Sequence, residues 1–117
     1  MERHRRPLRR IAIRSGGRIQ SLPVEEVHWF EAADNYLKIH TAKAVPLVRE
    51  TLAELERRLD PDVFIRIHRS AIVRIESILA VESLFHGDYE AVLRSGERLP
   101  VGRRYRERLL ETIGLRR

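Results

Sequence analysis

The strongest concentration of polar chemistry in this sequence lies between Phe64 and Val73. Two apolar, β-prone runs flank His68, Arg69 and Ser70, and the isoleucines before them alternate with Arg66 and His68, so an extended backbone sends the two sets to opposite faces. Arginine binds phosphate and guanine edges bidentately, and serine binds phosphate oxygens. A basic, hydrogen-bonding segment held between strands suits a polyanion better than a small neutral metabolite.

Two further polar clusters lie where one predicted element gives way to the next. Arg103 and Arg104 open the last predicted helix, whose free backbone N–H groups and dipole add partial positive charge there. Asn35, Tyr36 and Lys38 surround a predicted hairpin turn, and an asparagine side chain pairs with adenine in the major groove. Side chains at such boundaries project from a rigid scaffold. The three clusters together favour contact with a nucleic acid.

Each cluster also has a purely structural interpretation. In this interpretation Arg66 and Arg69 form surface ion pairs with Glu31 or Glu76, and His68 ties its segment to a backbone carbonyl. The two arginines of the last helix belong to its solvated face. The tyrosine of the third cluster lies partly in the core, with its hydroxyl group at the surface. The sequence leaves these alternatives open for each cluster taken alone.

Patterns for catalysis or metal binding are weaker. No two histidines have the helical i, i+4 spacing of metal ligands, and His28 and His40, on strands that should pair, are expected to be half-exposed. Ser70 follows His68 closely, but a catalytic triad needs a third, orienting group. The absence of cysteine excludes disulfides and thiolate chemistry. We therefore expect no enzyme, no metal site, no cofactor and no small-molecule substrate.

Composition favours a basic single domain. The 117 residues carry 23 Lys and Arg against 17 Asp and Glu, and arginine supplies nearly all of the positive charge. The formal net charge of +6 favours a polyanionic partner, although a GC-rich genome produces the same arginine excess. No apolar run reaches the length of a membrane span and no signal region follows the basic start, so we expect a cytoplasmic protein without membrane contact.

The order of elements predicts a mainly β fold. Residues 1–10 are expected to form a basic linker or arm, and residues 11–117 one domain in which short β-prone runs alternate with turn signals. The arm then serves as an interdomain linker or as an additional phosphate contact. The predicted strands cover residues 10–14, 18–22, 27–33, 36–41, 45–48, 64–67, 71–73, 78–84, 89–93 and 98–101.

Two short helices complete the prediction. Thr51 and Glu54 form a capping box for a helix that runs to Leu59, with the threonine oxygen and the glutamate side chain each satisfying a free backbone donor. A second helix is predicted from Arg103 to Ile113, with Gly114 as its C-terminal stop. Its inward-facing residues are expected to be Tyr105, Leu109, Leu110 and Ile113.

Four segments in this order resemble a known family, the LytTR DNA-binding domain, which is the output module of many bacterial response regulators. The matching strings are Val27 to Ala32 with Asn35-Tyr36, Leu52-x-x-Leu-Glu-x-x-Leu59, Phe64-x-Arg-x-His-Arg-Ser70 with Ile72-Val73, and Leu99-Pro-Val-Gly-Arg-Arg-Tyr105. Any one string is weak, but the four stand in the right order within residues 11–113, which makes the match strong. The sequence is therefore similar to this family over nearly its whole length.

The resemblance implies an elongated fold of small antiparallel sheets with one or two short helices. It implies sequence-specific binding of double-stranded DNA by loops that enter successive major grooves, in a two-component transcriptional regulator. A receiver domain, which residues 1–10 are too short to contain, or a second copy on direct-repeat sites is implied as a further partner. The residues that the resemblance places on DNA are Asn35, Tyr36, Lys38, Arg66, His68, Arg69, Ser70, Gly102, Arg103 and Arg104.

Two positions depart from the family pattern. Arg74 stands where the family commonly has asparagine, which puts a local structural hydrogen bond in doubt. Gly102 stands where serine is common, and we expect DNA contact there to shift from a hydroxyl group to the bare backbone N–H. The alternative function is a protein-interaction module whose basic face binds an acidic partner.

Overall fold

The structure is a computed structural model that describes residues 6–115. The strands are β1 (Arg10–Ser15), β2 (Arg18–Pro23), β3 (Val27–Ala33), β4 (Tyr36–Thr41), β5 (Leu47–Val48), β6 (Phe64–His68), β7 (Ala71–Arg74), β8 (Ile78–Ser83), β9 (Tyr89–Leu93) and β10 (Arg98–Val101). The helices are α1 (Leu52–Arg58) and α2 (Arg103–Thr112), with short 3-10 turns at Val24–Glu26, Ile75–Ser77 and Phe85–Gly87. Within residues 6–115, no helix combines the length and the apolar character that crossing a membrane requires.

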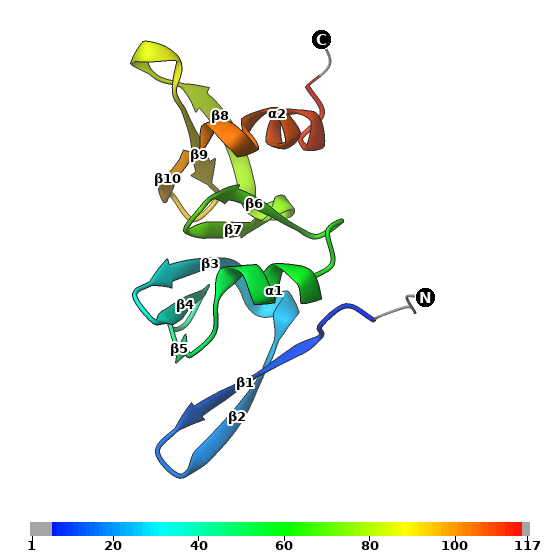
Figure 1. Ribbon diagram of the computed structural model, residues 1–117, viewed down its shortest axis with the longest axis vertical. Helices are drawn as coiled ribbons and strands as arrows, with labels where there is room; N and C mark the ends of the chain where they lie inside the picture. The colour runs from blue at the N-terminus through cyan, green and yellow to red at the C-terminus, as the bar shows by residue number, and fades with distance from the viewer. Residues whose placement is uncertain (1–5, 116–117) are drawn as a thin grey trace.

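The strands form three antiparallel sheets that follow one another along the long axis of the molecule (Figure 1). The β1–β2 hairpin lies at one end, a five-stranded sheet in the order β5-β4-β3-β7-β6 lies in the middle, and the sheet β10-β9-β8 lies with α2 at the other end. The principal extents are 49 × 37 × 23 Å. The predicted elongated, mainly β fold is confirmed.

Strands β3 and β7, in the interior of the central sheet, have buried residues on both faces because their side chains alternate between two cores. Phe30 and Ile72, which are cross-strand partners, pack with the hairpin and α1. Trp29 and Val73, the next pair along, pack with the third sheet and α2. Successive side chains of a strand point to opposite faces, so a strand with a core on either side is apolar nearly throughout. This arrangement explains why β3 and β7 are mostly apolar on both faces.

The first helix begins where the sequence predicts. Thr51 adopts an extended backbone conformation as the N-cap, and its Oγ1 accepts a hydrogen bond of 3.1 Å from the Glu54 backbone N–H. Leu52 and Leu55 are buried against the central sheet, and the helix ends before Leu59. The threonine half of the predicted capping box is therefore present, and it anchors the segment that leads from β5 into the core.

Replacing Thr51 by alanine is expected to lower the free energy of unfolding by about 0.5–2 kcal/mol, because the Glu54 N–H loses its acceptor. Urea unfolding followed by circular dichroism measures the change. The matched control is Thr112→Ala on α2, whose hydroxyl group only donates back to the Arg108 carbonyl at 2.7 Å. The control should stay within about 0.5 kcal/mol. Equal losses in the two variants would contradict the capping role.

The end of α2 departs from prediction at one residue. Leu109 is fully buried, as expected, but Ile113 is 40% exposed. The helix ends at Thr112, and Ile113 is the C-cap residue with a ψ of 4°, so its side chain leaves the helical face that Leu109 occupies. Gly114 follows with a φ of +103°, a conformation that favours glycine. The predicted stop is confirmed and the inward position of Ile113 is wrong.

Arg74, which stands where the family commonly has asparagine, forms two hydrogen bonds of its own to backbone carbonyls. Its Nε donates to the Val27 carbonyl at 2.8 Å and its Nη2 to the Val24 carbonyl at 2.6 Å. Its Cζ also lies 4.8 Å from the centroid of the Phe64 ring. The guanidinium group thus ties β7 to the chain that enters β3, using the two parallel donors that arginine presents.

Candidate nucleic-acid interface

The segment between β6 and β7 forms a tight turn, which we call the knuckle (residues 68–70). His68 pairs with Ala71, so Arg69 and Ser70 alone make the connection, and the register shifts between Arg66 and His68. A bulge of this kind redirects the side chains that follow it. The side chain of Arg69 is exposed and has no hydrogen bond or ion pair within residues 6–115. The knuckle therefore presents a free guanidinium group on a two-residue turn.

The imidazole of His68 stabilises the knuckle from within. Its Nδ1 accepts the Ser70 backbone N–H at 3.1 Å and lies 2.9 Å from the Ser70 Oγ. A backbone N–H only donates, so Nδ1 carries no proton and the hydrogen of the neutral ring is on Nε2. The Ser70 carbonyl accepts from the Ala32 N–H of β3 at 2.9 Å. His68 is thus structural, as one interpretation held, but its partner is an N–H and not the expected carbonyl.

Arg66 holds the knuckle from its other side. Its Nε and Nη2 donate to the carbonyls of His68 and Arg69, at 3.1 and 2.5 Å. Its Nη1 donates to Glu56 on α1 at 2.9 Å. The structural interpretation that paired Arg66 and Arg69 with Glu31 or Glu76 is therefore wrong, because in the described residues Arg66 pairs with Glu56 on α1 and Arg69 has no acidic partner.

The start of α2 lies directly beside the knuckle. The Gly102 backbone N–H donates to the Ile67 carbonyl at 2.8 Å, and a Cβ built on Gly102 would lie 3.8 Å from the His68 Cα and 3.1 Å from the Tyr105 ring. The Gly102 N–H, which the sequence analysis expected to contact DNA, is thus already hydrogen-bonded to β6 in this structure. Arg103 and Arg104 follow it on the first turn of the helix and are exposed. The structure therefore brings the first two basic clusters together.

The hairpin turn of the third cluster shares a shallow cleft of about 670 Å³ with the first cluster, and the start of α2 does not line this cleft. The hairpin turn with Asn35 and Tyr36 lines one part of this cleft, and Arg66 and Arg69 line another. Asp34, at the turn, has a φ of +56°, which sets the two-residue connection between β3 and β4. Tyr36 is 43% exposed and belongs to neither of the two cores, so its hydroxyl group and part of its ring are at the surface but its expected place in the core is wrong. Its ring is available at the edge of the cleft.

Sequence reasoning missed Arg49, which lines the same cleft. Its Cζ lies 5.6 Å from the centroid of the Tyr36 ring, and its side chain is exposed. The available signal was an arginine that stands two residues before the N-cap of α1, next to an anion-attracting helix start. Lys38 shares a strand face with Tyr36 but does not line the cleft.

The histidine of β4 is engaged in the central sheet and not in a metal site. The His40 Nε2 lies 2.8 Å from the Glu31 Oε1, and the His40 ring stacks on Trp29 with centroids 4.1 Å apart. His28 is half-buried beside the register shift of β3. Within residues 6–115 no group of three or more histidine, aspartate or glutamate side chains is arranged to hold a metal ion. No described carboxylate bonds to His68, so the His68–Ser70 pair lacks the third member of a triad.

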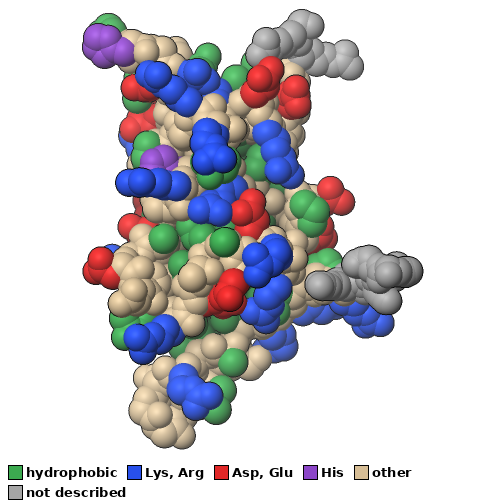
Figure 2. All heavy atoms as spheres, viewed as in Figure 1, with side chains coloured by type: hydrophobic (Ala, Val, Ile, Leu, Met, Phe, Trp, Pro, Cys, Tyr) green, Lys and Arg blue, Asp and Glu red, His purple; other side chains and the backbone are tan. Residues whose placement is uncertain are grey.

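Acidic partners neutralise some arginines and leave others free. Arg103 pairs with Asp88 at 3.3 Å across an exposed contact. Arg98, on β10, donates to Glu82 and Glu90, and these hydrogen bonds raise the pKa of Arg98 above its ordinary value. In the described part of the chain, the side chains of Arg69 and Arg104 have no acidic partner. Lys and Arg side chains lie along the whole length of the face in Figure 2, with acidic side chains between them.

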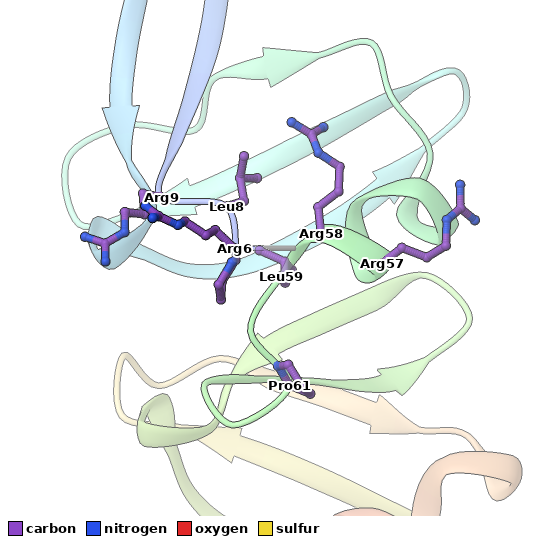
Figure 3. Close-up of a pocket in the computed structure, with 8 residues that line it drawn as sticks. Arg6, Leu8, Arg9, Arg57, Arg58, Leu59 and Pro61 are labelled. Atoms are coloured by element: carbon purple, nitrogen blue, oxygen red, sulfur yellow. The ribbon is translucent and has the colours of Figure 1, made fainter. Parts of the chain in front are cut away.

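A second concentration of arginine lies away from the knuckle, between the N-terminal segment and the end of α1. Arg6, Arg9, Arg57 and Arg58 line a hollow there, and the Leu8 N–H donates to the Arg58 carbonyl at 2.8 Å. Figure 3 shows that Arg57 and Arg58 point away from Arg9, so the four groups do not converge on one point. Of the predicted basic arm, residues 6–9 thus lie against α1, whereas Arg3 and Arg5 fall outside the described residues.

The chain is similar in sequence to parts of known transcriptional regulators. The chain is 35% identical over 97 residues to the CO-responsive transcriptional regulator RcoM of Rhodospirillum rubrum, covering 82% of this chain and 41% of that protein. It is 34% identical over 107 residues to the transcriptional regulatory protein LytR of Staphylococcus aureus, covering 82% of this chain and 44% of that protein. The chain thus spans less than half the length of these regulators.

A solved structure and a family model both match this chain to the same kind of domain. The fold matches the LytTr DNA-binding domain of a methyl-accepting/DNA response regulator from Bacillus cereus with a TM-score of 0.81 and 26% identity, covering 92% of this chain and 99% of that one. The family model of the LytTr DNA-binding domain matches residues 17–114, which include the knuckle, the hairpin turn and α2. The family is a DNA-binding regulatory domain and not a class of enzymes. This chain belongs to the LytTR DNA-binding domain family.

Proposed function

We propose that this chain binds double-stranded DNA sequence-specifically, as the output domain of a bacterial transcriptional regulator. In this proposal the knuckle, the start of α2 and the β3–β4 turn enter the major groove. One observation carries it: the unpaired Arg69 stands on a turn whose backbone is held on both sides, and it lines the same cleft as Asn35. A fixed guanidinium group is suited to the bidentate recognition of guanine.

The proposed contacts divide by chemistry. Arg69 and Arg104 read base edges, since their guanidinium groups are free, and Asn35 reads adenine. Arg103 and Lys38 hold phosphates. For Arg103, the exposed ion pair with Asp88 exchanges readily for a pair with a phosphate. His68 contributes Nε2–H, the ring donor left after its Nδ1 accepts from Ser70. Ser70, Gly102 and Tyr36 shape the surface around these groups, and Arg49 adds a phosphate contact beside Tyr36.

The rest of the regulator is part of the proposal. The relatives are transcriptional regulators of more than twice this length, so we propose that a further domain, such as a receiver, controls the DNA-binding domain. Occupation of direct-repeat sites by two copies and a cytoplasmic location belong to the same proposal. The basic protein-interaction module is the alternative that the experiment must exclude.

Arg69→Ala is expected to weaken binding to a cognate duplex by about 1–3 kcal/mol, roughly 5- to 150-fold, and to change binding to random duplex much less. The cognate sequence comes from selection of bound molecules from a random duplex pool. Affinities are measured by fluorescence anisotropy at one salt concentration, with a competitor of each kind. Arg14→Ala, which removes an exposed arginine of the β1–β2 hairpin, is the matched control and should change neither affinity appreciably.

Two outcomes would count against the proposal. Equal losses on cognate and random duplex would make Arg69 a phosphate contact and not a base-reading residue. A wild-type protein that does not distinguish selected from random duplex would contradict sequence-specific binding and favour the protein-interaction alternative, since specific DNA binders discriminate by several orders of magnitude.

A further inference from the structure

Arg66 is committed to the protein at every nitrogen of its guanidinium group. Nε donates to the His68 carbonyl, Nη2 to the Arg69 carbonyl and Nη1 to the carboxylate of Glu56. The side chain is only 16% exposed. Its Cζ lies 5.9 Å from the centroid of the Tyr105 ring on α2. Arg66 therefore contacts the knuckle, α1 and α2 at once. A side chain that contacts a ligand normally keeps a nitrogen free for it, and each guanidinium nitrogen of Arg66 already donates to the protein.

The bonds of Arg66 complete the restraint of the knuckle backbone. A two-residue turn at the surface normally leaves carbonyl groups that point to water and permit its peptide planes to rotate. Here the His68 and Arg69 carbonyls meet the planar fork of Arg66, while the Ser70 N–H and carbonyl are bound by His68 and by Ala32. Three consecutive carbonyls are thus fixed, and with them the direction in which the Arg69 side chain leaves the backbone.

We infer that Arg66 is a positioning residue, which presets Arg69 for base recognition and does not itself contact DNA. This inference rests on the proposed function and deepens it, by removing Arg66 from the set of DNA-contacting residues. A guanidinium group is required, because two carbonyls and one carboxylate are bound by three separate nitrogens in one plane. A lysine at this position keeps the charge but offers a single nitrogen on a flexible stem. Presetting lowers the conformational entropy that is lost on binding.

The test is Arg66→Lys, studied first without DNA. Hydrogen exchange of the Ser70 backbone amide, observed by ¹⁵N NMR, should become roughly 3- to 10-fold faster, because the turn opens more often when Arg66 no longer clamps it. Affinity for the selected duplex should fall roughly 3- to 15-fold. Affinity for random duplex and its salt dependence should not change, since the variant keeps the positive charge.

Two further variants make the test specific. Arg58→Lys is the matched control, because Arg58, the last residue of α1, also forms an ion pair of 2.8 Å, with Glu50, but has no hydrogen bond to the knuckle. It should alter neither the exchange rate nor either affinity. Glu56→Gln leaves the arginine in place and removes only the anchoring carboxylate, so it should shift both readouts in the same direction as Arg66→Lys by a smaller factor. If Arg66→Lys does not fold, Glu56→Gln still tests the positioning role, because it leaves Arg66 in place.

The possible results separate this inference from the proposed function. Unchanged Ser70 exchange in Arg66→Lys would overturn the positioning role, and so would an equal loss of affinity on selected and random duplex, which indicates a direct phosphate contact. Failure of the proposed function shows elsewhere, as a wild-type protein that does not prefer its selected duplex. The exchange measurement needs no DNA, so it tests whether Arg66 restrains the knuckle even if the protein does not bind DNA specifically.

Discussion

Raising the monovalent salt concentration from about 50 to about 200 mM is expected to weaken binding to duplex DNA by roughly 10²- to 10⁴-fold. The corresponding log–log slope is roughly −4 to −7, which follows from neutralisation of about five to eight phosphates and release of their counterions. The formal net charge of +6 and the exposed arginines along the molecule supply the required cations. Titrations by fluorescence anisotropy at four or more salt concentrations give the slope directly.

The arrangement of ion pairs sharpens this expectation. Arg58, Arg66 and Arg98 already have carboxylate partners in the protein, so they should contribute less to the slope than the proposed phosphate contacts Lys38 and Arg49. Arg104→Ala should make the slope less steep by about 0.9 if the guanidinium group lies at a phosphate, and should leave it nearly unchanged if it lies at a base. A wild-type slope near zero would contradict DNA binding altogether.

Phe30→Ala is expected to lower the free energy of unfolding by about 3–5 kcal/mol. Phe30 is 0% exposed at the centre of the middle sheet, and its ring centroid lies 5.5 Å from that of Phe64. Alanine leaves a cavity between β3, β6 and α1 that does not close readily, because β3 is held in place by hydrogen bonds to β4 on one side and to β7 on the other. Such a loss removes much of the roughly 5–15 kcal/mol that stabilises a typical domain. Urea unfolding measures it.

Phe85→Ala is the matched control for this prediction. The residue type and the substitution are the same, but Phe85 is 88% exposed at the end of the β8–β9 connection. Its removal should change the free energy of unfolding by no more than about 0.5 kcal/mol. A loss at Phe30 no larger than that at Phe85 would mean that the middle sheet is not the stabilising core of the molecule.

Most elements were predictable because their signals are local. The alternation in β1, the two-residue turn at Asp34-Asn35 and the cap at Thr51 depend on residues that are neighbours in the chain. Ile113 was predicted wrongly because the helical spacing continues one residue past the point at which the backbone leaves the helix. Backbone geometry at a helix end depends on the cap, and periodicity does not report it.

The site was predictable in its residue types and less so in its contacts. Arg69 and Arg104 stand free at element boundaries, as the sequence analysis expected. The packing of strands and helices decided three contacts that the sequence did not predict. Arg66 pairs with Glu56, the Gly102 N–H bonds to the Ile67 carbonyl, and Arg49 lines the cleft of the hairpin turn. Each of these contacts joins residues from separate elements. A sequence without the packing gives many such pairings equal weight.

The sequence by itself determined the elements, the basic character of the three clusters and membership of a DNA-binding family, because hydrophobic period, turn chemistry and motif spacing are properties of the chain. Only the tertiary structure decided what each polar group does. It joined Gly102 to β6, turned Arg66 inward against α1 and left Arg69 outward. The physical reason is that a hydrogen-bond donor has a limited number of partners, and which acceptors come within about 3 Å is set by the packing of the sheets.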